Sequence, residues 1–226
     1  MTTTNISEIS ELPDSHLLRK KKGRPLSFDR EHALHQAMLL FWQHGYESTS
    51  LNDLTSALGV PPSSIYTVFK DKKSLFLECV GLYLSGPVSS TLIIAQATTA
   101  YDAAAGLLQA AAMGFTGVDT PAGCLLATSA ISCSNAASDV QSKLADIRLG
   151  IEAQLRDKIE QSVTLGHLSA VAEPDALAAH TMAVIQGLST LARDGATREK
   201  LLKVVKIAMQ VWPQNTSMTI NSVANY

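Results

Sequence analysis

The sequence predicts an all-α protein, and two observations support that fold class. Apolar residues recur at spacings of three and four along most of the 226 residues, which is the period of an amphipathic helix. Strand signals, meaning alternating β-branched and aromatic residues joined by hairpin turns, are scarce. The length is sufficient for a sizeable core in one or two domains. We therefore expect an N-terminal three-helix domain, followed by a larger C-terminal helical domain.

A polar tail and a run of positive charge precede the first predicted helix. Residues 1–22 lack apolar periodicity and are predicted to be a disordered tail ending in a basic arm. The whole chain has a net charge of −2, yet residues 16–75 carry nine basic and five acidic side chains. A flexible basic arm can follow phosphates or enter a minor groove, whereas the alternative is a solvated charge run. The arm residues are Lys20, Lys21, Lys22 and Arg24.

The first helix is predicted over residues 29–44, with Ser27 as its N-cap. Gly45 ends it, because glycine is favoured just past a helix C-terminus. Its apolar stripe is wide enough to form the core of a small three-helix unit, and comprises Ala33, Leu34, Ala37, Met38, Phe41 and Trp42.

Residues 50–75 have the pattern of two helices joined by a tight turn. Ser50 and Asp53 form a capping-box-like start, and Gly59 favours a helix end. Pro61 and Pro62 lack backbone N–H groups, which suits a turn or the first turn of a new helix. The second helix is predicted over residues 61–69, with Ile65 and Phe69 facing the core.

The outer face of this second helix is small, polar and rich in hydroxyl groups, which suits a DNA major groove. We therefore interpret residues 23–71 as a helix-turn-helix DNA-binding domain. Thr49 and Ser50 are candidates for phosphate contacts, with a pure capping role as the alternative. Lys72 is a candidate phosphate contact at the start of the next helix. The remaining candidate contacts are Pro61, Pro62, Ser63, Ser64, Tyr66, Thr67 and Lys70.

The rest of the chain is predicted to be a helical domain over residues 72–212, followed by a disordered tail at 213–226. Asp71 is expected to cap its first helix, at about residues 72–84. The expected helices that follow are 88–97, 101–117, 122–134, 140–166, 175–193 and 197–211.

The last two predicted helices carry long apolar stripes. Two such antiparallel faces could form a four-helix bundle with a second copy across a two-fold axis. The candidate dimer residues are Leu177, His180, Val184, Leu188, Leu201, Val204 and Val205.

The stretch from Gly45 to Leu75 resembles the signature of the TetR/AcrR family of one-component bacterial transcription regulators. The resemblance is specific over residues 23–80, and Gly-Cys-Leu-Leu at 123–126 looks like an element common in one branch. Two departures are the proline pair with two serines at 61–64, where the family often has a basic residue, and Lys73 in place of a usual Glu. The matching residues are Gly45-Tyr46, Thr49, Leu54, Gly59-Val60, Ile65-Tyr66, Phe69, Lys72 and Leu75.

The resemblance implies a ligand-responsive homodimer, most often a repressor, that binds double-stranded DNA at a pseudo-palindromic operator. A small-molecule inducer in the C-terminal half would tilt the helix after the DNA-binding domain and release the operator. We expect a neutral or mildly apolar ligand. The candidate lining residues are Met113, Phe115, Cys124, Thr128 and Gln154.

Other function classes have weaker support. The chain shows no catalytic triad order, phosphate loop or metalloprotease spacing, so we expect neither an enzyme nor a cofactor. Cys79, Cys124 and Cys133 have no metal-binding spacing, and a helix over 122–134 would hold the latter two apart, leaving other disulfide pairings open. A reduced, cytoplasmic setting without a membrane partner is expected, since no signal peptide is seen. The alternative function is a helical dimeric interaction module without specific DNA binding.

Overall fold

The computed structural model describes residues 29–86, 89–130 and 133–213, and the regular structure within those ranges is entirely helical. The predicted arm and both predicted tails lie outside the described residues, apart from Pro213. The helices are α1 (Arg30–His44), α2 (Leu51–Leu58), α3 (Pro62–Phe69), α4 (Lys72–Leu84), α5 (Ser90–Gln96), α6 (Ala100–Gly114), α7 (Leu125–Thr128), α8 (Ser138–Thr164), α9 (Pro174–Arg193) and α10 (Arg198–Ala208), with 3₁₀ turns at Asn135–Ala137 and Met209–Val211.

The N-terminal helices begin and end at the predicted signals, with one correction. The N-cap of α1 is Asp29, whose carboxylate accepts hydrogen bonds from the backbone N–H groups of Glu31 and His32. Ser27, the predicted cap, lies outside the described residues. Ser50 and Asp53 form a capping box at α2, and Gly59 ends that helix in the left-handed conformation with φ of 64°.

Helices α1 to α4 form the head of the molecule, which is held together by an aromatic cluster. Phe41 of α1 meets Phe76 of α4 edge to face, with ring centroids 5.0 Å apart. Trp42 and Tyr83 make a second edge-to-face contact at 5.0 Å. Because α4 continues from the head into the rest of the chain, these contacts attach α1 to the helix that leaves the head.

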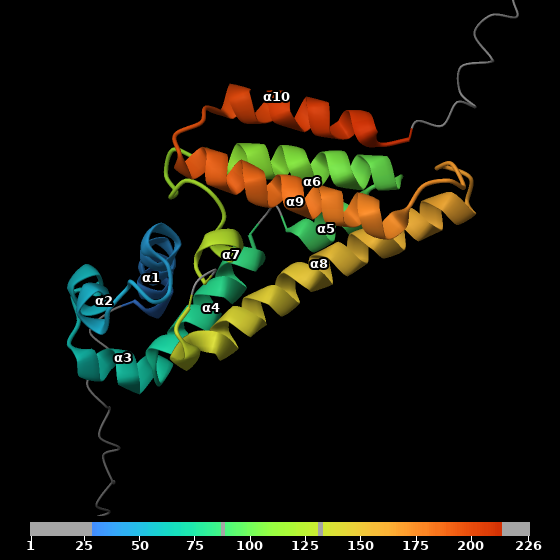
Figure 1. The fold of residues 1–226 in the computed structure, drawn as a ribbon. Coiled ribbons are helices and arrows are strands. Elements are labelled where there is room, and N and C mark those ends of the chain that lie inside the picture. The colour runs from blue at the N-terminus through green and yellow to red at the C-terminus, as the bar shows by residue number, and fades with distance from the viewer. Residues whose placement is uncertain (1–28, 87–88, 131–132, 214–226) are drawn as a thin grey trace, which may run out of the picture.

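The remaining helices form a separate layered body (Figure 1). Helix α6 packs against α5, α8, α9 and α10, so its alanine-rich faces lie at the centre of the body. Helix α8 runs the length of the body, from the head junction to the far end, where the chain turns back into α9. The body therefore contacts the head along α4, α7 and the start of α8.

The predicted helix over residues 122–134 is wrong: α7 spans only Leu125–Thr128. Gly123 before it has φ of +84°, and Ser129 after it gives its carbonyl oxygen to the backbone N–H of Tyr46 in the head, at 2.8 Å. Hydrogen bonds to another part of the fold thus replace the helical ones. The other predicted body helices are present, and their ends differ from the predicted ends by at most three residues.

The predicted apolar stripes of α9 and α10 face largely inward. Leu188, Leu201 and Val205 are at most 4% exposed and belong to the protomer's own core, so their prediction as dimer contacts is corrected. Leu177, His180, Val184 and Val204 are partly buried. The stripes were a signal of packing on α6 and α8 within one chain.

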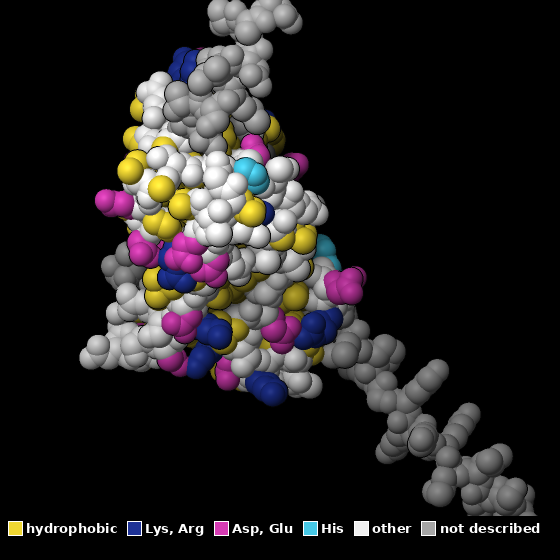
Figure 2. All heavy atoms as spheres, turned by 90° about the vertical axis from the view of Figure 1, so that its right-hand side faces the viewer, with side chains coloured by type: hydrophobic (Ala, Val, Ile, Leu, Met, Phe, Trp, Pro, Cys, Tyr) yellow, Lys and Arg dark blue, Asp and Glu magenta, His cyan; other side chains and the backbone are white. Residues whose placement is uncertain are grey.

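At the end of the body where α8 meets α9, acidic and basic side chains are interspersed (Figure 2). Arg156 lies there within ion-pair distance of Asp157, Glu160 and Asp175. Among the described residues, none of the helices is long and apolar enough to span a membrane.

Candidate nucleic-acid interface

Helix α3 divides its side chains between the head core and an outer surface. Ile65 and Phe69 are at most 1% exposed and anchor the helix against its neighbours. Tyr66, one position after Ile65, is 50% exposed on the outer face. Pro61, Pro62, Ser63 and Thr67 are also exposed, and Ser64 is half-buried. The sequence-predicted recognition face therefore lies on one accessible side of a firmly packed helix.

The start of α3 is fixed by backbone geometry alone. Pro61 occupies the N-cap position without a side-chain cap, and its carbonyl accepts the N–H of Ser64 at 2.9 Å. The Thr67 hydroxyl donates to the Ser63 carbonyl at 2.7 Å, so only its lone pairs remain for an outside donor. Apolar proline rings and hydroxyl groups thus make up most of this surface.

Thr49 and Ser50 both make hydrogen bonds within the head, although only Thr49 is buried and Ser50 is exposed. Thr49 is 1% exposed and its hydroxyl donates to the Gly45 carbonyl at 2.7 Å, which corrects its prediction as a surface contact. The Ser50 hydroxyl donates to the Asp53 carboxylate at 2.6 Å and also accepts the Asp53 N–H. The hydrogen bonds that the Ser50 hydroxyl and backbone N–H donate to this carboxylate lower the pKa of Asp53. Both residues cap and close the turn before α2.

Lys70 joins α3 to α4 in an unusual backbone conformation. It is the one described non-glycine residue with positive φ, at φ 70° and ψ −56°. The N–H of Asp71 donates to the Phe69 carbonyl across it, at 2.9 Å. This is a γ-turn of the strained positive-φ kind, which an L-residue adopts only at an energetic cost. The exposed Lys70 side chain leaves the head beside the recognition face.

Lys72 is held in place at the start of α4. Its ammonium lies 4.5 Å from the centre of the Tyr46 ring and donates to the Glu47 carbonyl at 3.4 Å. Burial lowers the pKa of Lys72 and, together with the Asp139 charge, raises that of Tyr46. The Asp71 cap of α4 accepts the Ser74 N–H at 2.6 Å, which lowers the pKa of its carboxyl group.

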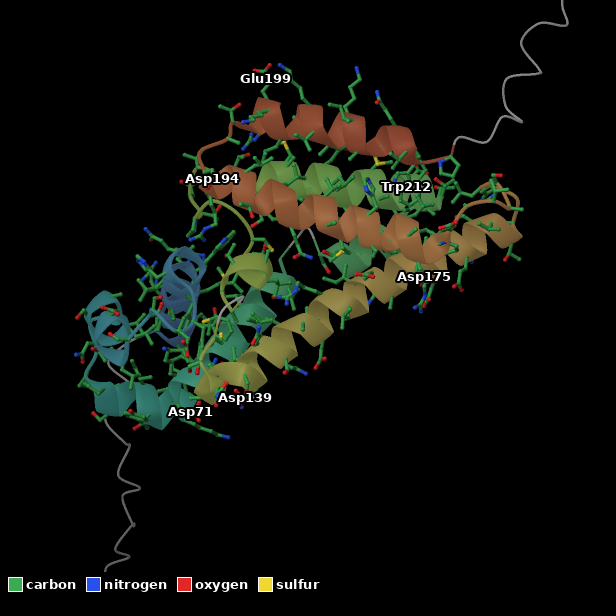
Figure 3. The ribbon with its side chains drawn as sticks, viewed as in Figure 1. Asp71, Asp139, Asp175, Asp194, Glu199 and Trp212 are labelled. Carbon is green, nitrogen blue, oxygen red and sulfur yellow. The ribbon has the colours of Figure 1, made fainter. Side chains whose placement is uncertain are left out.

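Lys73, which stands where the family usually has Glu, does not offer a free cation. Its ammonium pairs with Asp139 at the start of α8, and this hydrogen bond raises the pKa of Lys73. Asp71 and Asp139 lie at the same junction of head and body (Figure 3). Nearby, the Ser134 hydroxyl donates to the Glu47 carboxylate at 2.6 Å. These contacts fasten this edge of the head to the body.

The five predicted ligand residues are not gathered around one space. Met113 is 47% exposed, while Phe115 and Cys124 are buried in the core. The Thr128 hydroxyl donates to the Cys124 carbonyl at 2.7 Å. Gln154 does line a cavity of about 270 Å³ between α4, α5 and α8. The other lining residues are Leu84, Ser89, Ser90, Thr91, Ile147, Gly150 and Ile151.

Comparison with known proteins identifies the two parts of the chain. Residues 33–79 match the family model described as "Bacterial regulatory proteins, tetR family". Residues 103–207 match a model described as "Tetracyclin repressor-like, C-terminal domain". The chain belongs to the TetR family of bacterial regulatory proteins. This TetR family protein is accordingly a DNA-binding helix-turn-helix transcriptional regulator and not an enzyme.

Individual relatives support this over nearly the whole chain. The HTH-type transcriptional repressor ComR of Escherichia coli K12 is 33% identical over 199 residues, which is 87% of this chain and 95% of ComR. A cysteine-substituted variant of the TetR family regulator CifR, solved with 26-bp double-strand operator DNA, has a TM-score of 0.80. It is 34% identical and covers 84% of this chain and 100% of its own. A TetR regulator from Rhodococcus sp. RHA1 is 33% identical, with a TM-score of 0.58 over 82% of this chain and all of its own.

Sequence reasoning missed the polar link between head and body. Arg193, at the end of α9, donates to the carbonyls of Trp42 and Gln43 at the end of α1, at 3.2 and 3.1 Å. The Trp42 indole N–H donates to the Gly123 carbonyl at 3.0 Å. About 150 residues separate Arg193 from its partners in sequence, so periodicity could not find the link.

Proposed function

We propose that this protein is a homodimeric transcriptional repressor that binds a pseudo-palindromic operator and is released by a small neutral inducer. The main support is the exposed face of α3, whose apolar residues Ile65 and Phe69 fix it in the head. ComR is named a repressor, and CifR was solved on double-strand operator DNA. Two heads on a two-fold axis would enter major grooves about 34 Å apart.

The DNA contacts in this proposal are of two kinds. Lys70, Lys72 and the basic arm (Lys20, Lys21, Lys22 and Arg24) would bind phosphates and set the register. Ser63, Ser64, Tyr66 and Thr67 would lie near base edges, with Pro61 and Pro62 offering apolar contact to thymine methyl groups. Because hydroxyl groups discriminate bases less sharply than a bidentate arginine, DNA shape would contribute to specificity.

The dimer would form on the outer faces of α9 and α10. Small exposed residues on α9, Ala179, Ala183 and Gly187, allow another helix to approach closely. Leu202 and Ile207 on α10 are 38% and 65% exposed, and Val211 in the 3₁₀ turn after it is 57% exposed. Apolar side chains that the protomer leaves exposed in this way suit a second copy better than the buried stripe.

The inducer would occupy the cavity of about 270 Å³ beside Gln154. Its described lining offers three hydroxyl groups, one carboxamide and three aliphatic side chains but no charged group, which suits a small neutral molecule with one or two polar atoms. Leu84 brings the cavity to the end of α4, the helix that continues into the head. A ligand there would bias the angle of α4 and thus the separation of the two heads.

The test is fluorescence anisotropy of the full chain with DNA tiled across its upstream region, at two salt concentrations. Tight, salt-sensitive and sequence-selective binding to one near-palindromic tile is expected. The anisotropy change should saturate at one dimer per site. Equal, weak binding to specific and scrambled DNA at low salt would overturn the repressor proposal and favour an interaction module.

A further inference from the structure

A second cavity, which is widely open to solvent, lies at the junction between head and body. It has a volume of about 460 Å³ and is lined by Leu39 and Gln43 of α1, by residues 118–122 and by Arg193. It shares no lining residue with the cavity beside Gln154. In Figure 3 the label Asp194 marks the end of α9, directly after Arg193. A volume of this size suits a small organic molecule.

The Arg193 guanidinium is oriented before any ligand arrives. It donates to the carbonyls of Trp42 and Gln43 and, at 3.4 Å, to the Thr128 hydroxyl. The two carbonyls belong to the last turn of α1, which has no intrahelical donors for them. These three bonds use three of the five guanidinium N–H donors, so two remain for a ligand.

This guanidinium has no carboxylate partner in the part of the chain that the structure describes. The six ion pairs found there do not include Arg193. Asp119 lines the same cavity but lies beyond ion-pair distance. An oriented arginine without a counter-ion, beside a cavity, favours a carboxylate through paired charge-assisted hydrogen bonds.

The loop over residues 118–122 gives the cavity an apolar but solvent-exposed side, on which Val118 is 95% exposed. Val118, Pro121 and Ala122 contribute aliphatic surface. The loop that carries them is anchored just beyond, at Gly123, whose N–H donates to the Phe115 carbonyl at 3.0 Å and whose carbonyl accepts the Trp42 indole N–H at 3.0 Å. Anchoring at this end of the loop reduces the ordering cost of binding a small ligand.

We propose that this cavity binds a small organic carboxylate with an apolar body, and that binding is transmitted to the head through α1. The ligand carboxylate would take the free N–H donors of Arg193, while its body lies against Leu39 and Pro121. Since the same guanidinium holds the end of α1, sharing it with an anion weakens the bonds to Trp42 and Gln43. The resulting shift of α1 lowers operator affinity.

The test uses benzoate, with benzamide as its neutral isostere, and ¹H–¹⁵N spectra of the full chain. Trp42 and Trp212 are the two tryptophans, so a Trp212→Phe variant identifies the Trp42 indole signal. Because that N–H bonds to Gly123 beside the cavity, we expect benzoate to shift it with saturation and benzamide to leave it unchanged. Arg193→Gln should abolish the shift.

Arg198→Gln is the matched control. Arg198 also donates to a nearby carbonyl and hydroxyl, both of Thr116, but does not line the cavity. It should keep the benzoate shift. If Arg193→Gln fails to fold, Gln43→Glu places a negative charge in the cavity while leaving Arg193 intact, and should abolish the shift in its place.

Absence of a Trp42 shift with benzoate, or an equal shift in Arg193→Gln, would overturn the site. Operator affinity that is unchanged by saturating benzoate would overturn its transmission to the head. The spectra need no DNA, and operator binding without benzoate is measured separately, so failure of this site is distinguishable from failure of the repressor proposal.

Discussion

Replacing Lys70 with glycine should make the protein more stable and its DNA binding weaker. The residue is held at φ 70° and ψ −56° by the hydrogen bond from the Asp71 N–H to the Phe69 carbonyl. For an L-residue this conformation crowds Cβ against the backbone, whereas glycine adopts it without that penalty. The strain is retained directly beside the recognition face, where a lysine side chain can contact phosphate.

The stability gain is the difference between two terms. Strain of this kind costs about 1–3 kcal/mol, and glycine loses about 0.5–1 kcal/mol through the greater entropy of its unfolded chain. We expect Lys70→Gly to gain about 1 kcal/mol. In a chain of 226 residues this corresponds to a rise in Tm of roughly 2–4 °C, measurable by circular dichroism.

The DNA effect follows from counterion release. Each lost phosphate contact reduces the slope of log K against log salt by about 0.9, so a dimer that loses one contact per head loses about 1.8. Anisotropy titrations with the operator over a salt series measure this slope. The loss of affinity should be nearly equal on specific and scrambled DNA, because a phosphate contact carries no base information.

Lys70→Ala is the matched control, since it removes the ammonium but keeps the strained Cβ. It should show the same loss of salt slope without the gain in Tm. If glycine and alanine give the same Tm, the γ-turn stores no strain. If neither changes the slope, Lys70 does not contact DNA and the argument from position fails.

Gly123, Cys133 and Asp71 allow three further tests, of a crowded backbone position, of side-chain burial and of a helix cap. Gly123→Ala should lower the unfolding free energy by about 1–3 kcal/mol in urea titrations, because φ of +84° and the nearby carbonyl leave no room for Cβ; an unchanged midpoint would contradict this. Iodoacetamide should label half-buried Cys133 first, because Cys79 and Cys124 are buried. Its rate should rise with pH as the reactive thiolate forms, and at a higher pH than for an ordinary thiol, because partial burial and the Glu47 charge raise the pKa of Cys133. Labelling of Cys79 or Cys124 at the same rate in the native protein would refute the burial argument. The pKa of the Asp71 carboxyl group is lowered in the folded protein. Its stabilising cap is therefore present above the ordinary pKa of about 3.9 and is lost as the pH falls through the folded value. Asp71→Asn should reduce the loss of stability in acid, which urea unfolding at about pH 6 and pH 3 measures.

The features that depend on neighbouring residues were predictable from sequence. The Ser50–Asp53 capping box, the left-handed Gly59 and the Asp71 cap each involve residues at most three apart, so local chemistry determines them. The same holds for the burial of Ile65 and Phe69, since a spacing of four places both on one face of a short helix. These features predicted the bounds and the buried face of α3 correctly, while its contacts with DNA stay a prediction.

Features that depend on contacts between distant segments could not be predicted in this way. Periodicity shows that Leu188 and Leu201 face something apolar, but not whether it belongs to the same chain or to a second copy. Helix α7 stops early because Ser129 bonds to the head, and nothing near residue 129 in the sequence indicates that. Thr49 matched the family signature, yet its hydroxyl is consumed inside the head.

Both cavities border the packed pair of helices α1 and α4 in the head. The cavity beside Gln154 reaches α4 at Leu84, and the cavity beside Arg193 reaches α1 at Gln43. Helices α1 and α4 are the most extensively packed pair in the head, joined by the edge-to-face contact of Trp42 with Tyr83.

If an inducer at α4 and a carboxylate at α1 both favour the head arrangement that releases DNA, thermodynamic linkage requires each to tighten binding of the other by the same factor. A coupling of about 1–3 kcal/mol is typical, which is roughly a 5–150-fold change in Kd. Once operator displacement has supplied an inducer, its Kd should therefore fall in saturating benzoate and stay unchanged with benzamide. Equal inducer Kd values in the two solutions would show that the cavities act on separate elements, even if each ligand alone releases DNA.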